Sequence, residues 1–329
     1  MKRTMAVRRR QILKASGALA FSSLLPLRAT AQQAARIVVP FAPGASNDLV
    51  GRMMAEALSK AVGRTYVVEN RPGAGSMLGT QFVADARPAD GRTLLLCATA
   101  SMGILPAISK NVRYSVERDF DFIVRIASSP FGLAVRKGFP ANDFAEFVQV
   151  AKSRPGEVRM GAAGVGALDY MGASLMQYEV DIDLNIIPYK GMGPVLTDIQ
   201  GGHIDACIVS PASLRPLVED GSVKMLAVFD TRRSDVLPDV PSAADIGHPD
   251  LRAGNWWGIA GPAGIPAETL QELQAAMVKI VNDPAFAQSL KEKGFDPAPL
   301  SGEAFKQFVL ADFERWKTVA KRANVTLDG

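Results

Sequence analysis

Short apolar runs alternate along the chain with segments in which apolar residues recur at helical spacing. The run RIVVPFAPG (36–44) ends in Pro-Gly and is typical of a buried strand. Residues 46–62 are predicted to be a helix, because their apolar side chains form one face. TYVVEN (65–70) and GRTLLLCATA (91–100) predict two further strands, with a second helix at about 76–86 between them. Strands and helices that alternate through short connections predict a mainly parallel sheet with helices on both faces.

The alternation continues to the end of the chain. The segment FDFIVRIASSPFGLAVRK (120–137) is one long extended run. Beyond it, the pattern predicts strands and helices in turn, with strands at about 158–166, 184–191, 204–211 and 223–230 and helices at about 144–153, 167–180 and 194–201. The C-terminal part, 266–325, is largely helical, with Pro266 and Ser301 at predicted helix starts.

Only two segments have the pattern expected of connections between lobes, the run 120–137 and the return near 223–235. Two lobes joined by two extended connections predict a hinged α/β protein whose ligand lies where the strand C-termini of both lobes converge. The expected boundaries are a leader at 1–31, a first lobe built from 32–127 and 229–329, and a second lobe at 128–228.

The leader changes how the charge of the chain is interpreted. The 329 residues include 37 Lys and Arg against 33 Asp and Glu, a net charge of +4. Seven of the basic residues lie in 1–31, which has no acidic residue, so the remainder has 30 basic and 33 acidic residues. The net positive charge therefore belongs to the leader, and it does not indicate a nucleic-acid partner.

The leader itself predicts export. A basic start is followed by the apolar stretch ASGALAFSSLLPL and by ATA at 29–31, the pattern of a cleavable secretory signal with a mature start at Gln32. The apolar stretch is shorter than the roughly 20 residues of a membrane span. RRQILK (9–14) also resembles a twin-arginine signal, so both export routes stay open. We expect a periplasmic protein.

Few residues indicate catalytic or metal chemistry. Cys97 and Cys207 lie in apolar strand-like runs 110 positions apart, which favours two buried free thiols over a disulfide. His203 and His248 are the only histidines and lack metal-ligand spacing. No G-x-S-x-G elbow occurs. We expect no enzyme activity, no metal and no cofactor.

Three glycine-rich turns each lead from a predicted strand into a predicted helix: FAPGASND (41–48), RPGAGSMLG (71–79) and GAAGVGALDY (161–170). None has the Lys-Ser/Thr ending of a phosphate-binding P-loop. GAGSMLG is a variant of the dinucleotide fingerprint, but the next strand ends in CATAS, without the acidic residue that holds the ribose. The alternative interpretation of these three segments is that their glycines only permit tight turns and close helix packing. Three helix starts with free N–H groups favour an anion site, and a small carboxylate suits it, since Arg71 is the only basic residue in the first two turns.

These residues carry a resemblance to a known family. IVVPFAPGASNDLVGRMMAEAL, VVENRPGAGSMLG and IPYKGMGPVLTDIQGGHIDA resemble ordered motifs of the Bug receptor family, the periplasmic substrate-binding proteins of tripartite tricarboxylate transporters. LPDVPSAADIG and WWGIAGPAGIPAE are similar to the second half of that family, so the resemblance spans 36–325.

The resemblance implies a two-lobed type II periplasmic binding protein fold, with a small carboxylate held between the lobes by backbone N–H groups and with transporter membrane subunits as partners. We expect a monomer. Carried over to this chain, it implies ligand contacts in three groups of residues: Gly44, Ala45, Ser46, Asn47 and Asp48; Gly73, Ala74, Gly75, Ser76 and Met77; and Gly164, Val165, Gly166, Ala167, Asp169, Tyr170, Lys190 and Asp205.

Some positions depart from the family pattern or allow two interpretations. Ala167 and Tyr170 stand where the family pattern has Thr and His, so we expect a ligand with an apolar or aromatic body. Asp48 is expected to orient the loop and helix more than to contact ligand. For Asp205, contact with a ligand hydroxyl or amine and a satisfied acid at a strand start stay equally open. For Lys190, pairing with a second carboxylate and a solvated side chain stay equally open. Four aromatic residues complete the candidates. Phe41 and Phe131 abut a turn or a connection and are expected to line the cleft, whereas Trp256 and Trp257 are expected to pack in the core.

The sequence therefore predicts a solute receptor that captures a small carboxylate for a tripartite tricarboxylate transporter. The alternatives are an exported nicotinamide-dependent oxidoreductase and a ligand receptor for a sensor kinase.

Overall fold

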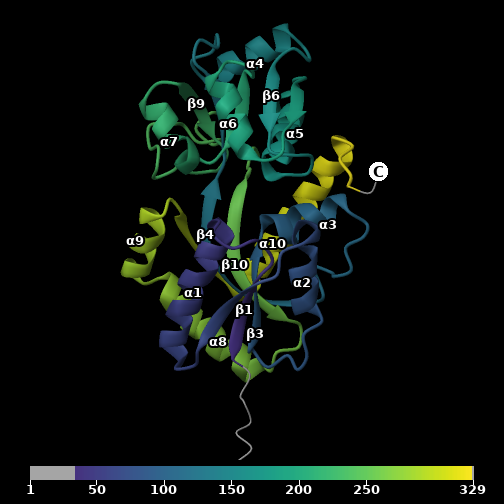
Figure 1. Ribbon diagram of the computed structural model, residues 1–329, viewed down its shortest axis with the longest axis vertical. Coiled ribbons are helices and arrows are strands. Elements are labelled where there is room, and N and C mark those ends of the chain that lie inside the picture. The colour runs from purple at the N-terminus through teal and green to yellow at the C-terminus, as the bar shows by residue number, and fades with distance from the viewer. Residues whose placement is uncertain (1–33, 328–329) are drawn as a thin grey trace, which may run out of the picture. The chain divides into compact units, whose positions relative to one another are not determined.

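The computed structural model describes residues 34–327, and the predicted signal segment at 1–31 lies outside the described residues. Within that range the chain forms two β-sheets with helices on their faces (Figure 1). The strands are β1 (Ala35–Val39), β2 (Tyr66–Asn70), β3 (Thr93–Ala98), β4 (Phe120–Pro130), β5 (Gly132–Arg136), β6 (Arg159–Ala162), β7 (Asn185–Pro188), β8 (Ala206–Val209), β9 (Val223–Val228), β10 (Gly254–Pro262) and β11 (Asp296–Ser301). The helices are α1 (Ser46–Val62), η1 (Ala74–Ser76), α2 (Met77–Ala84), η2 (Thr99–Ile104), α3 (Leu105–Ile108), α4 (Phe144–Ser153), α5 (Leu168–Val180), α6 (Met192–Gln200), α7 (Pro211–Glu219), α8 (Ala267–Val281), α9 (Pro284–Glu292) and α10 (Gly302–Arg322).

Sheet A has six strands in the order β11-β4-β10-β3-β1-β2. The predicted alternation of strands and helices produces its parallel part, in which β1 pairs with β2 and β3. The strands β10, β4 and β11 complete the sheet through antiparallel pairs. The sheet is mixed, because β10 and β11 run against β1, β2 and β3, whereas β4 runs in the same direction as those three strands.

Sheet B has five strands in the order β7-β6-β8-β5-β9. It repeats the same division, with β6 parallel to β7 and β8 and with β5 antiparallel to β8 and β9. In both sheets the parallel strands end beside a helix start, so the loops that follow β1, β2 and β6 lie at strand C-termini, where ligands of open α/β sheets bind.

The extended run 120–137 divides between the two sheets at Phe131. Residues before it form β4 of sheet A, and residues after it form β5 of sheet B. The chain returns through the segment 229–253, which connects β9 to β10. The two connections are hydrogen-bonded to each other, since Phe131 N donates to Ala253 O and Phe229 N donates to Phe131 O.

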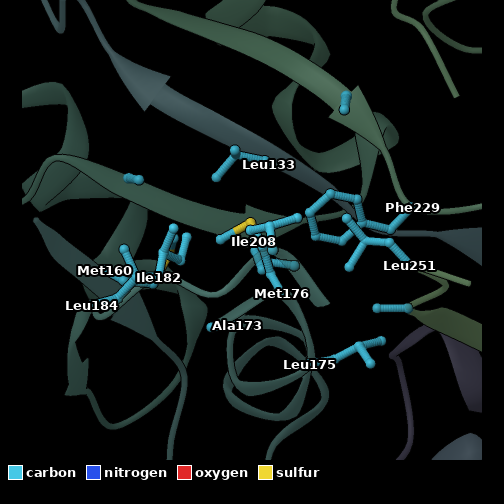
Figure 2. Close-up of a cluster of buried hydrophobic side chains, with 14 of the residues drawn as sticks. Leu133, Met160, Ala173, Leu175, Met176, Ile182, Leu184, Ile208, Phe229 and Leu251 are labelled. Carbon is cyan, nitrogen blue, oxygen red and sulfur yellow. The ribbon is translucent and has the colours of Figure 1, made fainter. Parts of the chain in front are cut away.

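Each sheet buries side chains on both faces, as the alternation of side chains along a strand requires. On sheet A, Ile37 and Val39 pack in the cluster that includes α1, whereas Val38 packs in the cluster that includes Phe305 of α10. On sheet B, Leu133 and Ile208 pack with Met176 of α5 (Figure 2). The predicted apolar face of α1 is buried against the sheet through Val50, Met54 and Leu58.

The two thiols lie in separate sheets and are unpaired, as the sequence predicts. Cys97 belongs to β3 and Cys207 to β8, and both are buried. Burial raises the pKa of both thiols, for Cys207 to about 12. Within residues 34–327, no helix is long and apolar enough to cross a membrane.

Candidate ligand cleft

The loop between β1 and α1 is held in place by one carboxylate. Asp48 is 4% exposed and accepts hydrogen bonds from Gly44 N at 3.0 Å, Arg52 Nε at 2.9 Å and Asn70 Nδ2 at 2.9 Å. Asn70 Nδ2 also donates to Phe41 O at 3.2 Å. The hydrogen bond from Arg52 holds the pKa of Asp48 at about 2, so the side chain stays ionised and acts on the loop rather than facing the solvent.

The start of α1 leaves backbone donors free. Its N-cap, Ala45, provides no side-chain acceptor, so the N–H groups of the first turn have no partner within the helix. Gly44, Ala45 and Ser46 are exposed. Asn47 is engaged elsewhere, because its Oδ1 accepts a hydrogen bond from Trp257 Nε1 at 2.7 Å.

The loop between β2 and α2 has a left-handed backbone over four consecutive residues. Gly73, Ala74, Gly75 and Ser76 have φ angles of 137°, 46°, 65° and 89°. Alanine and serine rarely adopt positive φ, so the loop is strained at Ala74 and Ser76. Ser76 is 3% exposed, and its Oγ has no hydrogen-bond partner. A buried hydroxyl without a partner is the group that a polar ligand atom would satisfy. Met77, the next residue, is half-buried and packs against the sheet A cluster that contains Val38.

The loop between β6 and α5 repeats the arrangement of the first loop. Asp169 is 3% exposed and accepts a hydrogen bond from Ala163 N, as Asp48 does from Gly44 N. Burial raises the pKa of Asp169, and its backbone hydrogen bonds oppose that shift. The N-cap of α5, Ala167, provides no side-chain acceptor. Both acidic residues therefore orient loops, a role that the sequence indicated for Asp48 alone.

These loops enclose a cavity of about 410 Å³, which we name the cleft cavity. The first loop contributes Pro40, Phe41 and Ala42; the second contributes Pro72, Gly73, Gly75 and Ser76; and the third contributes Val165, Gly166 and Ala167. The third loop lies close to α3 here, because a Cβ on Gly166 would lie 2.5 Å from Ile108 Cδ1. The only hydroxyl among its lining side chains is that of Ser76, and the rest are apolar or glycine.

The wall formed by η2, α3 and the C-terminal segment was not predicted from the sequence. Ala100, Ile104, Leu105 and Ile108 line the cavity together with Leu327, whose N–H donates to Ile108 O. The signal was present in the sequence, since the apolar run that begins at β3 continues to Ile108 and is too long for one strand.

Several predicted residues lie outside the lining of the cleft cavity. They are Gly44, Ala45, Ser46, Asn47, Asp48, Ala74, Met77, Phe131, Gly164, Asp169, Tyr170, Lys190 and Asp205. Gly164 and Ala74 are next to lining residues along the chain, and the first-loop residues 44–48 follow the lining residue Ala42 after Pro43. Phe131 and Tyr170 instead pack against the sheet B core. The backbone of Phe131 is bound into the connection between the sheets, and a contact of its side chain with ligand stays a prediction.

Lys190 lies beside the third loop and is exposed. Its neighbours Tyr189 and Gly191 donate backbone hydrogen bonds to Ala162 O and Ala163 O. The structure therefore places Lys190 next to the loop but not in the cavity lining.

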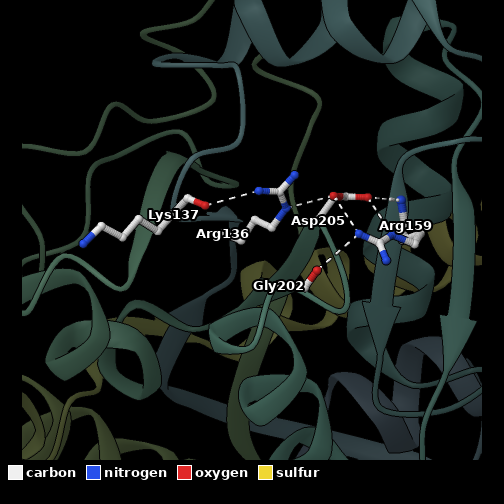
Figure 3. Close-up of polar contacts among 5 residues, drawn as sticks. All are labelled: Arg136, Lys137, Arg159, Gly202 and Asp205. Carbon is white, nitrogen blue, oxygen red and sulfur yellow. Dashed lines mark hydrogen bonds and ion pairs between the residues drawn. The ribbon is translucent and has the colours of Figure 1, made fainter.

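Asp205 lies at the opposite end of sheet B from the cleft cavity, because it lies beside Arg159 at the start of β6, whereas the third loop follows the end of β6. Figure 3 shows its polar contacts. It precedes β8 and pairs with Arg136 Nε and Arg159 Nε, each at 3.0 Å. Burial alone would raise the pKa of Asp205, but hydrogen bonds from Arg159 and Arg136 outweigh it and lower the pKa to about 2. Of the two open interpretations, the structure supports the structural one.

Replacing Asp205 with asparagine is expected to reduce the free energy of unfolding at pH 7 by about 2 kcal/mol without changing ligand affinity, because two arginines lose their carboxylate. Its folded-state pKa is depressed, so the stabilisation is present above the ordinary value of 3.8 and is lost as the pH falls toward 2. Urea unfolding at pH 7 and pH 3 measures this. Asp239→Asn, at an exposed position, is the control. A large loss of ligand affinity in Asp205→Asn would contradict a structural role.

Within the described part of the chain, no three His, Cys, Asp or Glu residues are grouped in a way that could hold a metal ion. The donors at the cleft cavity are backbone N–H groups and one hydroxyl, which suit an anion rather than a cation.

Comparison with known proteins places this geometry among periplasmic receptors. A family model described as the tripartite tricarboxylate transporter family receptor matches residues 50–325. The protein BugT of Bordetella pertussis is 27% identical over 293 residues, which cover 89% of this chain and 90% of BugT.

Solved structures share the fold. A TctC solute-binding protein from Polaromonas, solved with no ligand, is 29% identical with a TM-score of 0.79 and covers 88% of this chain and 98% of its own. R. palustris Rpa4515 with adipate is 28% identical with a TM-score of 0.73, covering 89% and 98%. MatC from Rhodopseudomonas palustris with bound malate is 28% identical with a TM-score of 0.68, covering 87% and 98%.

Proposed function

Because the chain belongs to the tripartite tricarboxylate transporter receptor family, we propose that it captures a small carboxylate with an apolar body in the periplasm. On this proposal the liganded protein delivers the acid to the membrane subunits of a tripartite tricarboxylate transporter. The observation that carries the proposal is the composition of the cleft cavity, which combines an apolar wall with the N-cap of α5 and the buried, unpartnered hydroxyl of Ser76.

The apolar wall supports an apolar body for the ligand. Ile104, Leu105 and Ile108 face the same cavity as Phe41 and Val165. Burying apolar ligand surface against such a wall contributes about 25 cal/mol per Å². A citrate-like polyacid would instead place its second and third carboxylates against side chains that offer no hydrogen bond, which costs free energy.

The loop backbones support a carboxylate as the charged end of the ligand. The first turns of α1 and α5 carry partial positive charge, and neither N-cap has a side-chain acceptor. Ser76 Oγ adds a buried hydroxyl. Charge-assisted hydrogen bonds contribute about 1.5–3 kcal/mol each, so a few of them together with the apolar contact account for micromolar affinity, about 8 kcal/mol.

The ligands of two related structures support a small carboxylate as the ligand of this chain. Adipate and malate are both small dicarboxylates, and adipate has a methylene chain between its carboxylates. The lining of the cleft cavity favours an acid whose body resembles that of adipate over a hydroxylated one.

A thermal-shift screen tests the proposal. Adipate and benzoate at millimolar concentration are expected to raise the melting temperature by several degrees, since a ligand at 100 times its Kd adds about 2.7 kcal/mol of stability. Citrate and the uncharged analogue benzamide are expected to have little effect, and sodium chloride at matched ionic strength controls for salt. Stabilisation by citrate alone would contradict the apolar body, and the absence of stabilisation by any carboxylate would contradict the receptor function.

A further inference from the structure

A second cavity, of about 440 Å³, lies at the connections between the two sheets, and we name it the hinge cavity. Its lining includes Pro130 at the end of β4, the segment from Phe229 to Arg232, and Arg252 with Ala253 before β10. Parts of β11 and α10 close it from the side of sheet A. None of its lining residues belongs to the cleft cavity, so the two are separate sites.

The hinge cavity has an excess of positive charge. Four arginines line it, Arg125, Arg232, Arg252 and Arg315, against two acidic residues, Asp230 and Asp312. Asp312 is already occupied, since it accepts hydrogen bonds from Trp256 Nε1 at 2.8 Å and from Arg315.

Arg125 lines the hinge cavity and is held there by its neighbours. Its Nε donates to Ala298 O at 2.7 Å, and its guanidinium lies 4.4 Å from the centre of the Phe308 ring. Among residues 34–327, no carboxylate forms an ion pair with it. Burial lowers the pKa of Arg125, and the charges of Asp230 and Asp312 oppose that shift without cancelling it. An unpaired, partly buried guanidinium that faces a cavity is a candidate binding group.

The other groups at the cavity fit an anion with several oxygen atoms. Arg232 and Arg252 are exposed at its rim, and Arg252 also forms a long, exposed ion pair with Asp250 at 4.0 Å. Asn255 and Ser128 add uncharged hydrogen-bonding side chains to the lining. Arginine presents paired N–H donors that match the oxygen atoms of phosphate and carboxylate groups. The volume exceeds that of a single phosphate group.

We infer that the hinge cavity is a binding site for a small multivalent oxyanion of the diphosphate class, separate from the carboxylate cleft. Arg125 is its inner binding group, and Arg232 and Arg252 bind from the rim. The cavity wall comes from both connections between the sheets, so an anion bound there contacts the segments that any change in the angle between the sheets must move.

The hinge cavity is also connected to the cleft cavity through the backbone. Thr99 Oγ donates to Gly254 O at 3.1 Å and accepts from Trp256 N at 2.9 Å, and both of these residues line the hinge cavity. The next residue after Thr99 is Ala100, which lines the cleft cavity. An anion in the hinge cavity is therefore expected to change carboxylate affinity, and a carboxylate must change anion affinity by the same factor.

Calorimetric titration with pyrophosphate, in a buffer free of phosphate and sulfate, tests the inference. Wild type is expected to bind one pyrophosphate per chain, and bound pyrophosphate is expected to raise its melting temperature. Phosphate and sulfate are expected to bind more weakly. Arg125→Gln is expected to bind pyrophosphate at least tenfold more weakly than wild type. In the absence of anion, the melting temperature of this variant is expected to be no lower than that of wild type, because an unpaired charge has been removed. Arg113→Gln, at an exposed position, is the matched control and should bind like wild type.

A second variant separates the two sites. Ala167→Phe obstructs the cleft cavity and is expected to keep full pyrophosphate affinity, whereas Arg252→Gln is expected to lose part of it. Saturable binding that Arg125→Gln leaves unchanged, binding abolished by Ala167→Phe, or no saturable binding by wild type up to about 10 mM would each overturn the inference. A uniformly lower melting temperature of Arg125→Gln, with or without anion, would show that Arg125 serves packing alone.

Discussion

Replacing Ala167 with phenylalanine is expected to weaken carboxylate binding about 100-fold or more, which corresponds to about 3 kcal/mol. Ala167 is the N-cap of α5, and its side chain lines the cleft cavity. An aromatic ring at this position would occupy space in a cavity of about 410 Å³ and would cover the N–H groups at the start of α5. Titration of the stabilising acid found in the thermal-shift screen measures the loss.

The matched control is Ala275→Phe, which adds the same ring at an exposed position of α8, away from the cleft cavity. It is expected to bind with wild-type affinity. Both variants should unfold with nearly wild-type stability in the absence of ligand, because neither ring enters the packed core. Wild-type affinity in Ala167→Phe would show that the acid binds elsewhere.

Replacing Asp48 with asparagine is expected to lower the free energy of unfolding by about 2 kcal/mol and to weaken carboxylate binding about tenfold. An amide cannot accept all three hydrogen bonds that the carboxylate accepts from Gly44 N, Arg52 and Asn70. The first loop then loses the contacts that fix its donors. Urea unfolding with and without ligand separates the two effects.

The contribution of Asp48 to stability is expected to depend on pH. The hydrogen bond from Arg52 lowers the folded-state pKa of Asp48 from 3.8 to about 2, so its stabilisation is full above pH 3.8 and declines as the pH falls toward 2. The stability difference between wild type and Asp48→Asn should therefore be constant from pH 7 to about 5 and smaller at pH 3. Arg52→Gln should reproduce part of the effect, and a difference that grows on acidification would contradict the role given to Asp48.

Periodicity predicted most of the described secondary structure. The predicted helices at 46–62 and 144–153 match α1 and α4, because each has an apolar face that packs on a sheet. The run 120–137 was predicted to be extended, and it is extended on both sides of Phe131. Its division between two sheets could not be predicted, since the break at Phe131 depends on hydrogen bonds to residues about 100 positions away.

Strands β10 and β11 were not predicted. Residues 254–262 contain three glycines and end in proline, composition that disfavours a strand locally. They form one because β3 and β4 flank them on both sides. Close packing requires glycine there, since a Cβ on Gly258 would lie 2.3 Å from Phe305 Cζ.

The family resemblance that the motifs carried is confirmed by the family model over residues 50–325. The candidate site was predictable where glycine turns precede helices, as for Gly73, Ser76 and Gly166. It was not predictable for Leu327, which reaches the cleft cavity only through the path of the C-terminal segment. The lobe boundaries and the set of ligand contacts stay predictions.

The burial of both native thiols makes the protein a convenient scaffold for an optical reporter. Cys97 and Cys207 are the only cysteines of the chain, and neither is accessible in the folded protein. A single cysteine introduced at Val165, which is 48% exposed on the cavity wall, would therefore be the one site that a maleimide dye labels. The emission of an environment-sensitive dye at that position would report occupancy without any change to the core.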